Sequence, residues 1–132
     1  MGCNSHLSIE YYNGERWDAF ALDVPESRNY MMYELMAGVR GEDKNAFIKP
    51  RGIPKDADEV TKAWFKRWDC DGHTPSYLTA SEFRQVVNAY TAKARQEGYG
   101  LAKAWEAVRN VLSALEETYG DDKVRVVFFF DN

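Results

Sequence analysis

The segment Lys123–Asp131 constrains the fold most, because it is a run of β-branched and aromatic residues typical of a buried strand. A strand this apolar has to pair with other strands to be stable. Two segments near the N-terminus, His6–Tyr12 and Trp17–Val24, have extended patterns, and the Asn13-Gly14 dipeptide between them is a strong signal for a hairpin turn. We therefore expect an antiparallel sheet of about three strands, built from the N-terminal hairpin and the C-terminal strand.

About four helices are predicted between the hairpin and the closing strand. Their signals are apolar residues at helical spacing and residues suited to helix ends: Met32, Met36 and Val39 before Gly41; Val60, Trp64 and Trp68; the capping box Thr79-Ala80-Ser81-Glu82; and a long apolar stripe ending at Gly120. The segment 41–54 and the segment that carries His73 are predicted as loops. This order predicts an α+β fold, in which a small antiparallel sheet is covered on one face by about four helices.

Composition bounds the class of protein. The chain has 132 residues, of which 45% are hydrophobic, so we expect a single domain spanning 1–132. Its longest apolar stretch, Val126–Phe130, is only strand-sized, which predicts a soluble protein with no membrane partner. Two distant cysteines do not make a disulfide framework, so a cytoplasmic location is expected. A net charge of −4 argues against non-specific nucleic-acid binding.

All cysteines and histidines lie in two short runs, Cys3–His6 and Cys70–His73. In each run a thiol and an imidazole stand three residues apart, so Cys3, His6, Cys70 and His73 together could fill a tetrahedral zinc shell. The more ordinary interpretation is a small buried thiol and a hydrogen-bonded histidine at each place. A third is that the histidines contact a ligand directly. No cofactor is assigned, and zinc is the metal that this set would hold.

Several short motifs span nearly the whole chain: Met1-Gly2-Cys3 followed by His6, Arg28-Asn29-Tyr30, Ala37–Arg40, Pro50–Pro54, Asp71–Thr79 and Val124–Asp131. In this combination the chain resembles a family of small proteins common in bacteriophages and bacterial genomes, whose members open with Met-Gly-Cys-Asp-Ile-His. It differs from that family at Asn4 and Ser5, and at Pro75, where a second histidine is common. These differences argue against a metal-hydrolase site, and Cys70 lies outside the shared motifs.

The polar residues in the shared motifs are the candidate ligand-binding residues. They are His6, Arg28, Asn29, Tyr30, Arg40, Arg51, Asp71 and His73. Arginine presents a planar fork of donors that suits phosphate or carboxylate, and histidine with tyrosine can complete a pocket for an aromatic anion. Nucleotides have this chemistry. For each arginine, an ion pair that fixes a loop is the alternative.

Three functions compete. The first is a phage-type binding protein that captures a small anionic, nucleotide-like ligand, sequestering a defence signal in the host cytoplasm; the phage context comes from the resemblance. The second is a phosphoester hydrolase that uses a metal, or His6 and His73 as acid and base. The third is a protein-interaction inhibitor of a host factor. The sequence lacks a phosphate-binding loop and a nucleophile elbow, which argues against most common enzyme classes and favours binding.

Apolar residues also bear on assembly. Trp17, Met31 and Tyr33 add apolar surface that a three-stranded sheet would leave uncovered. Because an exposed apolar patch usually marks a contact, a symmetric homodimer is predicted.

Overall fold

The computed structural model of the protein describes residues 2–24 and 26–132, so Met1 of the opening motif lies outside the described residues. The described residues form four strands, four α-helices and two short 3₁₀ turns. In chain order these are β1 (Asn4–Tyr12), β2 (Trp17–Ala21), α1 (Tyr30–Ala37), η1 (Asp43–Asn45), α2 (Glu59–Arg67), η2 (Asp69–Asp71), β3 (Gly72–Thr79), α3 (Ala80–Glu97), α4 (Lys103–Tyr119) and β4 (Val124–Asp131).

The four strands form one antiparallel sheet in the order β2-β1-β4-β3. The C-terminal strand β4 therefore lies in the middle, with β1 and β3 as its neighbours. In β1, Ser8 pairs with Val127, and Tyr77 of β3 pairs with the same residue from the other side. The predicted α+β fold, with an antiparallel sheet formed by the N-terminal hairpin and the C-terminal strand, is confirmed.

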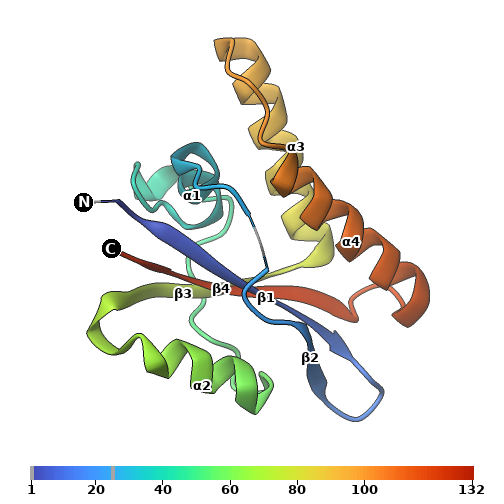
Figure 1. Cartoon of the computed structure of the whole chain (residues 1–132). Coiled ribbons are helices and arrows are strands. Elements are labelled where there is room, and N and C mark those ends of the chain that lie inside the picture. The colour runs from blue at the N-terminus through green and yellow to red at the C-terminus, as the bar shows by residue number, and fades with distance from the viewer. Residues whose placement is uncertain (1, 25) are drawn as a thin grey trace.

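Helices cover both faces of this sheet. Figure 1 shows α1, α3 and α4 above the sheet, α2 below it, and the start of β1 beside the end of β4. Along β4, Val126, Phe128 and Phe130 belong to the main core under α1, α3 and α4. The alternate residue Phe129 contacts aromatic rings from α2 and the residue that follows it. The prediction that helices cover one face was wrong, because a run that is apolar at every position is buried on both sides.

The sequence does not predict β3; it predicts a loop around His73. Thr74 has a left-handed backbone (φ 51°), and the register with β4 shifts between His73 and Ser76. This bulge, together with Pro75, hides the alternation that identifies a strand. β3 is an edge strand, and the Pro75 carbonyl accepts from the Gly52 amide outside the sheet, so Pro75 faces away from β4 and costs no hydrogen bond within the sheet.

The helix boundaries follow local chemistry. The predicted capping box is present at the start of α3: the Thr79 hydroxyl accepts from the Glu82 amide, and the Glu82 carboxylate accepts from the Thr79 amide. α1 ends earlier than predicted, at Ala37, because Gly38 adopts a left-handed conformation (φ 76°) and caps the helix.

The stripe predicted for α2 needs a correction. Val60 is 54% exposed, whereas Thr61 is buried. Trp64 and Phe65 turn toward Phe129 of the sheet, with ring centroids 5.1 and 5.0 Å from it. Of the predicted stripe, Trp64 and Trp68 do lie against Phe129, and only Val60 is turned to solvent.

Two further expectations concern the surface and the cysteines. Tyr33 is buried in the core, Met31 is partly buried against it, and Trp17 lies against the guanidinium of Arg125, 3.8 Å from ring centroid to Cζ, so these residues do not form the expected apolar patch. The homodimer stays a prediction.

Cys3 and Cys70 are both free thiols, Cys3 buried and Cys70 exposed. Within residues 2–24 and 26–132, no helix has the length and apolar character needed to cross a membrane.

Candidate functional site

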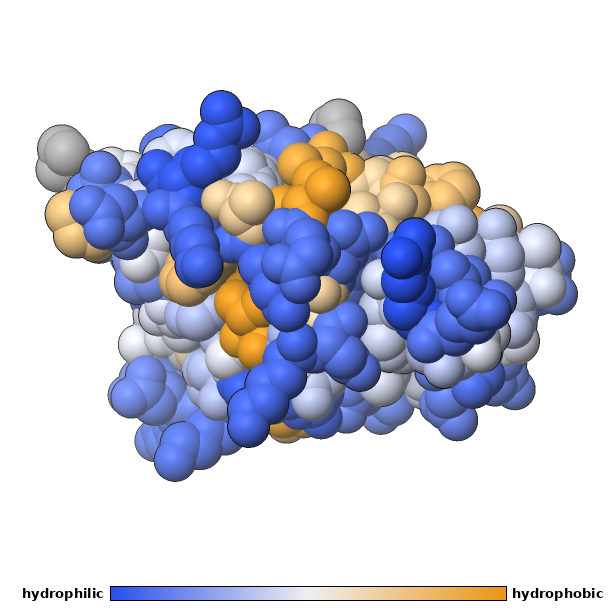
Figure 2. Space-filling model, turned by 90° about the horizontal axis from the view of Figure 1, so that it is seen from below, coloured by the Kyte–Doolittle hydropathy of each residue, from blue (hydrophilic) through white to orange (hydrophobic). Residues whose placement is uncertain are grey.

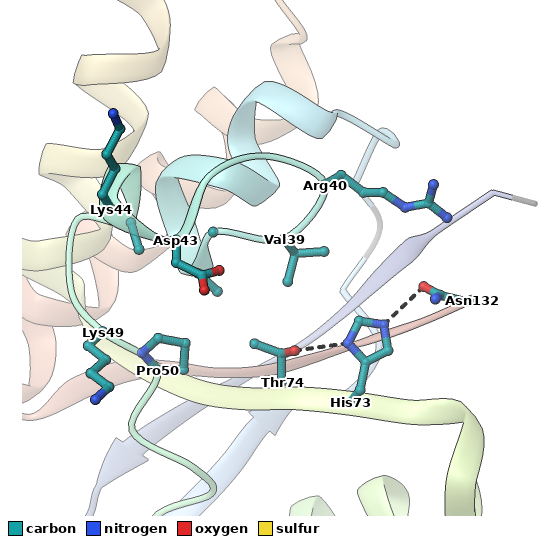
Figure 3. A pocket seen from close by; sticks show the side chains of 12 residues that line it. Val39, Arg40, Asp43, Lys44, Lys49, Pro50, His73, Thr74 and Asn132 are labelled. Carbon is teal, nitrogen blue, oxygen red and sulfur yellow. Dashed lines mark hydrogen bonds between the residues drawn. The ribbon is translucent and has the colours of Figure 1, made fainter.

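The main candidate site is an open cavity of about 740 Å³ between the loop that follows α1 and the beginning of β3. Figure 3 shows its arrangement. The wall combines apolar, cationic and hydrogen-bonding groups from three parts of the chain: Ala37, Gly38, Val39, Arg40, Asp43, Lys44, Ala46, Lys49, Pro50, His73, Thr74 and Asn132. We call it the α1–β3 cavity.

Local backbone conformation shapes this cavity. A Cβ atom at Gly38 would lie 2.8 Å from the Cα of Asp43, so only glycine allows the loop to fold back against the end of α1. Arg40 (φ 61°) and Thr74 (φ 51°) are also left-handed and line opposite walls. For a β-branched residue such as Thr74 this conformation is an outlier, and strained residues of this kind cluster at ligand sites.

Positive charge is concentrated around the α1–β3 cavity, although the protein has a net charge of −4. Arg40, Lys44 and Lys49 contribute three cations, and among the lining residues that the structure describes Asp43 has the single carboxylate side chain. In Figure 3 the Asp43 carboxylate turns into the cavity, Arg40 extends past one end above Asn132, and the two lysines extend outward from the opposite rim. Lys44 pairs with the exposed carboxylate of Glu42 at 3.4 Å, an ion pair worth about 0–1 kcal/mol, and exposed lysine side chains change rotamer within nanoseconds, so a ligand anion can compete for it.

His73 is fixed at one end of the cavity. Its Nε2 lies 2.9 Å from Oδ1 of Asn132, and its Nδ1 lies 2.9 Å from the hydroxyl of Thr74. The Asn132 side-chain oxygen accepts from Nε2, and Nδ1 shares the second hydrogen bond with the Thr74 hydroxyl, which can donate or accept. The imidazole also stacks on Phe130 at 6.2 Å between ring centroids. Its position is therefore set before any ligand arrives.

His6 lies on the opposite face of the sheet. It pairs with Phe129 of β4, whereas His73 pairs with the adjacent Phe130, and adjacent residues of a strand point to opposite faces. His6 Nε2 hydrogen-bonds to Asp131 Oδ2, and its ring lies 4.4 Å from that of Trp68. The two histidines therefore cannot act together on one substrate.

The four residues considered for zinc are also separated. Cys3 is buried in the core on the face that carries α1, and Cys70 is exposed on η2. Together with the placement of His6 and His73 on opposite faces, this leaves no shared point for a metal ion. Over residues 2–24 and 26–132, no group of three or more His, Cys, Asp or Glu side chains is arranged to hold a metal.

Cys3 lies next to the Arg40 end of the cavity. Burial raises the pKa of the Cys3 thiol above its usual value, and a hydrogen bond from Arg40 partly opposes this shift. The Cys3 amide donates to the hydroxyl of Tyr30 at 3.1 Å, and the ring of Tyr30 lies 5.3 Å from the Arg40 guanidinium carbon. Cys3 and Tyr30 therefore help to position Arg40.

The structure does not bring the other predicted residues into this cavity. Asn29 caps α1, because its Oδ1 accepts from the Met32 amide and its Nδ2 donates to the Tyr90 hydroxyl. Arg28 donates to Asn4 Oδ1 and lines a smaller cavity of about 350 Å³ beside β1. Asp71 lies exposed on η2.

Arg51 is held outside the α1–β3 cavity. Its guanidinium makes a two-bond ion pair with the Glu82 carboxylate, with both N–O distances 2.7 Å, and also donates to the Tyr77 carbonyl. The hydrogen bond from Arg51 is the main reason why the pKa of Glu82 is lowered. Of the eight residues predicted to bind ligand, only Arg40 and His73 line the cavity.

Sequence reasoning missed several lining residues. Asp43, Lys44, Lys49, Thr74 and Asn132 line the cavity but were not predicted. The two lysines carried a usable signal, since they lie in the same loop after α1 that carries Arg40. Asn132 carried no signal in the sequence, because its position in the cavity depends on β4 lying beside β3.

The comparisons with known proteins give no guide to this site. No protein-family model, no curated protein and no solved structure matches the chain.

Proposed function

We propose that the protein binds a small anionic, nucleotide-like molecule in the α1–β3 cavity. The observation that carries this proposal is the collection of Arg40, Lys44, Lys49 and a preorganised His73 around one cavity of a net-acidic protein. A concentration of cations in a concave site favours anions by Coulomb attraction and by focusing the field. Such a cavity also has the size of a small-molecule site.

The polar groups favour one orientation of the ligand. At one end, Arg40 offers donors suited to phosphate, and the imidazole of His73 lies beside it. Val39 and Pro50 give an apolar wall against which a planar ring can pack. This assigns the phosphate to the His73 end and the ring to the middle of the cavity.

Asp43 narrows the class of ligand. A carboxylate turned into the cavity repels a simple anion such as inorganic phosphate, but it accepts hydrogen bonds from hydroxyl or amino groups. A nucleotide carries both an anionic group and such donors. The ligand is therefore expected to be a nucleotide-like molecule rather than inorganic phosphate alone.

Binding without turnover is the function that this geometry supports. A hydrolase that used His6 and His73 as acid and base would need both near one bond, and they lie on opposite faces of the sheet. A protein that only retains its ligand can sequester a signal molecule. The resemblance to phage proteins supports a role of this kind against a defence signal of the host.

Isothermal titration calorimetry tests the proposal with adenosine, guanosine, cytidine and uridine monophosphates, the corresponding nucleosides, and inorganic phosphate. We expect at least one nucleotide to bind, with its nucleoside and inorganic phosphate both weaker by about tenfold or more, since each lacks part of the recognised chemistry. Arg40→Gln and His73→Ala should weaken nucleotide binding, and Arg95→Gln, an exposed site on α3, should leave it unchanged. The absence of binding by all four nucleotides would overturn the proposal.

Native mass spectrometry of the protein as purified provides an independent measurement. One spectrum reports a retained small molecule, any bound metal and the number of subunits. A mass increment that matches a nucleotide and is lost in His73→Ala supports the proposal. Stoichiometric zinc in its place would favour the metal-binding alternative despite the separation of the four candidate ligands.

A further inference from the structure

A second concave surface lies away from the α1–β3 cavity. Pro75 of β3 and Ile53 of the preceding loop form one side, and Phe65 of α2 forms the other. Together with neighbouring residues they line an apolar groove of about 540 Å³. Figure 2 views the molecule from the side that carries α2, where small hydrophobic areas show between hydrophilic residues. We call this surface the α2 groove.

Lysines border the α2 groove on both sides. Lys62 and Lys66 stand one helical turn apart on α2, and Lys55 lies on the loop opposite. In the described part of the chain, Lys55 and Lys66 have no ion-pair partner, and Lys62 pairs at 3.2 Å with Glu59, which is 88% exposed. An exposed pair of this kind is worth about 0–1 kcal/mol, so a ligand carboxylate can replace Glu59.

The walls of the groove are held in place by other contacts. The Gly52 amide donates to the Pro75 carbonyl at 3.0 Å, and the Arg51 amide donates to the Ser76 hydroxyl at 3.0 Å. Phe65 is fixed from behind by Phe129, with ring centroids 5.0 Å apart. A groove that exists before binding loses little conformational entropy when a partner enters it.

Charge complementarity identifies the kind of partner. An apolar floor between three lysines fits a segment whose apolar side chain enters the groove while carboxylates on both sides meet the lysines. A nucleic acid would need cations continued along its backbone, but the surface next to the groove carries Asp56, Asp58 and Glu59, whereas a short segment needs cations only at the groove, where the three lysines lie. We infer that the α2 groove binds an acidic peptide segment of a partner protein through one apolar anchor residue.

Fluorescence anisotropy tests this inference with three labelled peptides. One carries a single leucine with glutamates on both sides, the second has serine in place of the leucine, and the third has lysine in place of the glutamates. The affinity of the first peptide should be higher than that of either other peptide by about tenfold or more, because each of those lacks one element of recognition. Changing the peptide leaves the protein fold untouched.

Charge reversal on the protein gives the matching test. Lys62→Glu combined with Lys66→Glu should lower the affinity for the leucine–glutamate peptide about tenfold. The control, Arg95→Glu combined with Lys103→Glu, alters the net charge equally at exposed positions outside the groove and should leave affinity within about twofold. The inference would be overturned if the three peptides bound equally or if the two double variants had equal effects. It would also be overturned if a thymidine oligonucleotide bound more tightly than the leucine–glutamate peptide.

Discussion

Arg125 of β4 donates a hydrogen bond from Nε to Oε1 of Glu10 of β1 at 2.9 Å, and the side chains are only 7% and 0% exposed. The other carboxylate oxygen of Glu10 accepts from the Asp58 amide and the Thr61 hydroxyl, at 2.9 and 2.8 Å. Both of these groups lie at the start of α2. The buried ion pair therefore ties the helix that forms one wall of the α2 groove to the centre of the sheet.

Replacing Arg125 by methionine should be strongly destabilising. The substitution leaves the Glu10 carboxylate buried without its counter-charge, which costs about 3–5 kcal/mol of the free energy of unfolding. Urea denaturation followed by circular dichroism measures this loss. Arg67→Met, at an exposed position of α2, is the control and should change the free energy by less than about 0.5 kcal/mol. A loss below about 1 kcal/mol for Arg125→Met would contradict this account.

The elements that local chemistry specifies were predicted from the sequence. Asn13-Gly14 predicted the hairpin, and Asn13 shapes the observed turn, since its side-chain oxygen accepts from the amides of Glu15 and Arg16. The capping box of α3 and the apolar stripe of α4 were likewise recognised, because each depends on residues close together in the chain.

What the sequence could not specify depends on long-range pairing. The bulge in β3 interrupts its alternation, so only the pairing with β4 reveals the strand. That same pairing puts His73 beside Asn132 and places His6 on the other face. Arg51 and Arg40 look alike in the sequence. Their roles differ because Glu82 lies within reach of Arg51 in the folded chain.

The middle position of β4 predicts a large cost for shortening its core residues. Phe128→Ala removes a fully buried ring under the helices, so we expect a loss of about 3–5 kcal/mol in the free energy of unfolding. Phe20→Ala is the matched control: Phe20 is 52% exposed on the edge strand β2, and its loss should be about 1 kcal/mol or less. Thermal and urea denaturation of both variants give the comparison. Similar losses would contradict the burial of Phe128 in the core between the sheet and the helices.

Glu26 should make stability depend on pH. Burial raises the pKa of its carboxyl from 4.5 to about 7, a hydrogen bond from Ser5 opposes the shift, and the charge of Asp23 adds to it. A raised pKa means that the folded state holds the proton more tightly than the unfolded state. The resulting stability is fully present below pH 4.5 and is lost as the pH rises through about 7. We expect this loss to be about 1–3 kcal/mol.

Glu26→Gln tests this dependence, because the amide oxygen still accepts from Ser5 but the group no longer titrates. Urea denaturation between about pH 4.5 and pH 8 measures the free energy of unfolding. It should fall by about 1–3 kcal/mol more in the native protein than in the variant. Glu97→Gln, at an exposed position near the end of α3, should behave like the native protein. Parallel pH profiles for Glu26→Gln and the native protein would show that Glu26 ionises normally.

Arg51→Ala should separate the structural arginine from the ligand-binding one. Losing the two-bond pair with Glu82 and the bond to the Tyr77 carbonyl should lower the free energy of unfolding by about 1–2 kcal/mol, a value reduced for partial exposure. Because the pair lowers the pKa of Glu82, its contribution is present above the usual carboxyl pKa and fades as the pH falls. The difference in the free energy of unfolding between native protein and variant should therefore shrink in acid.

The nucleotide affinity of Arg51→Ala, measured by calorimetry, should stay within about twofold of the native value. Arg40→Gln should show the reverse pattern of weak nucleotide binding and near-native stability. If Arg51→Ala abolished binding with stability unchanged, Arg51 and not Arg40 would be the arginine that contacts the ligand.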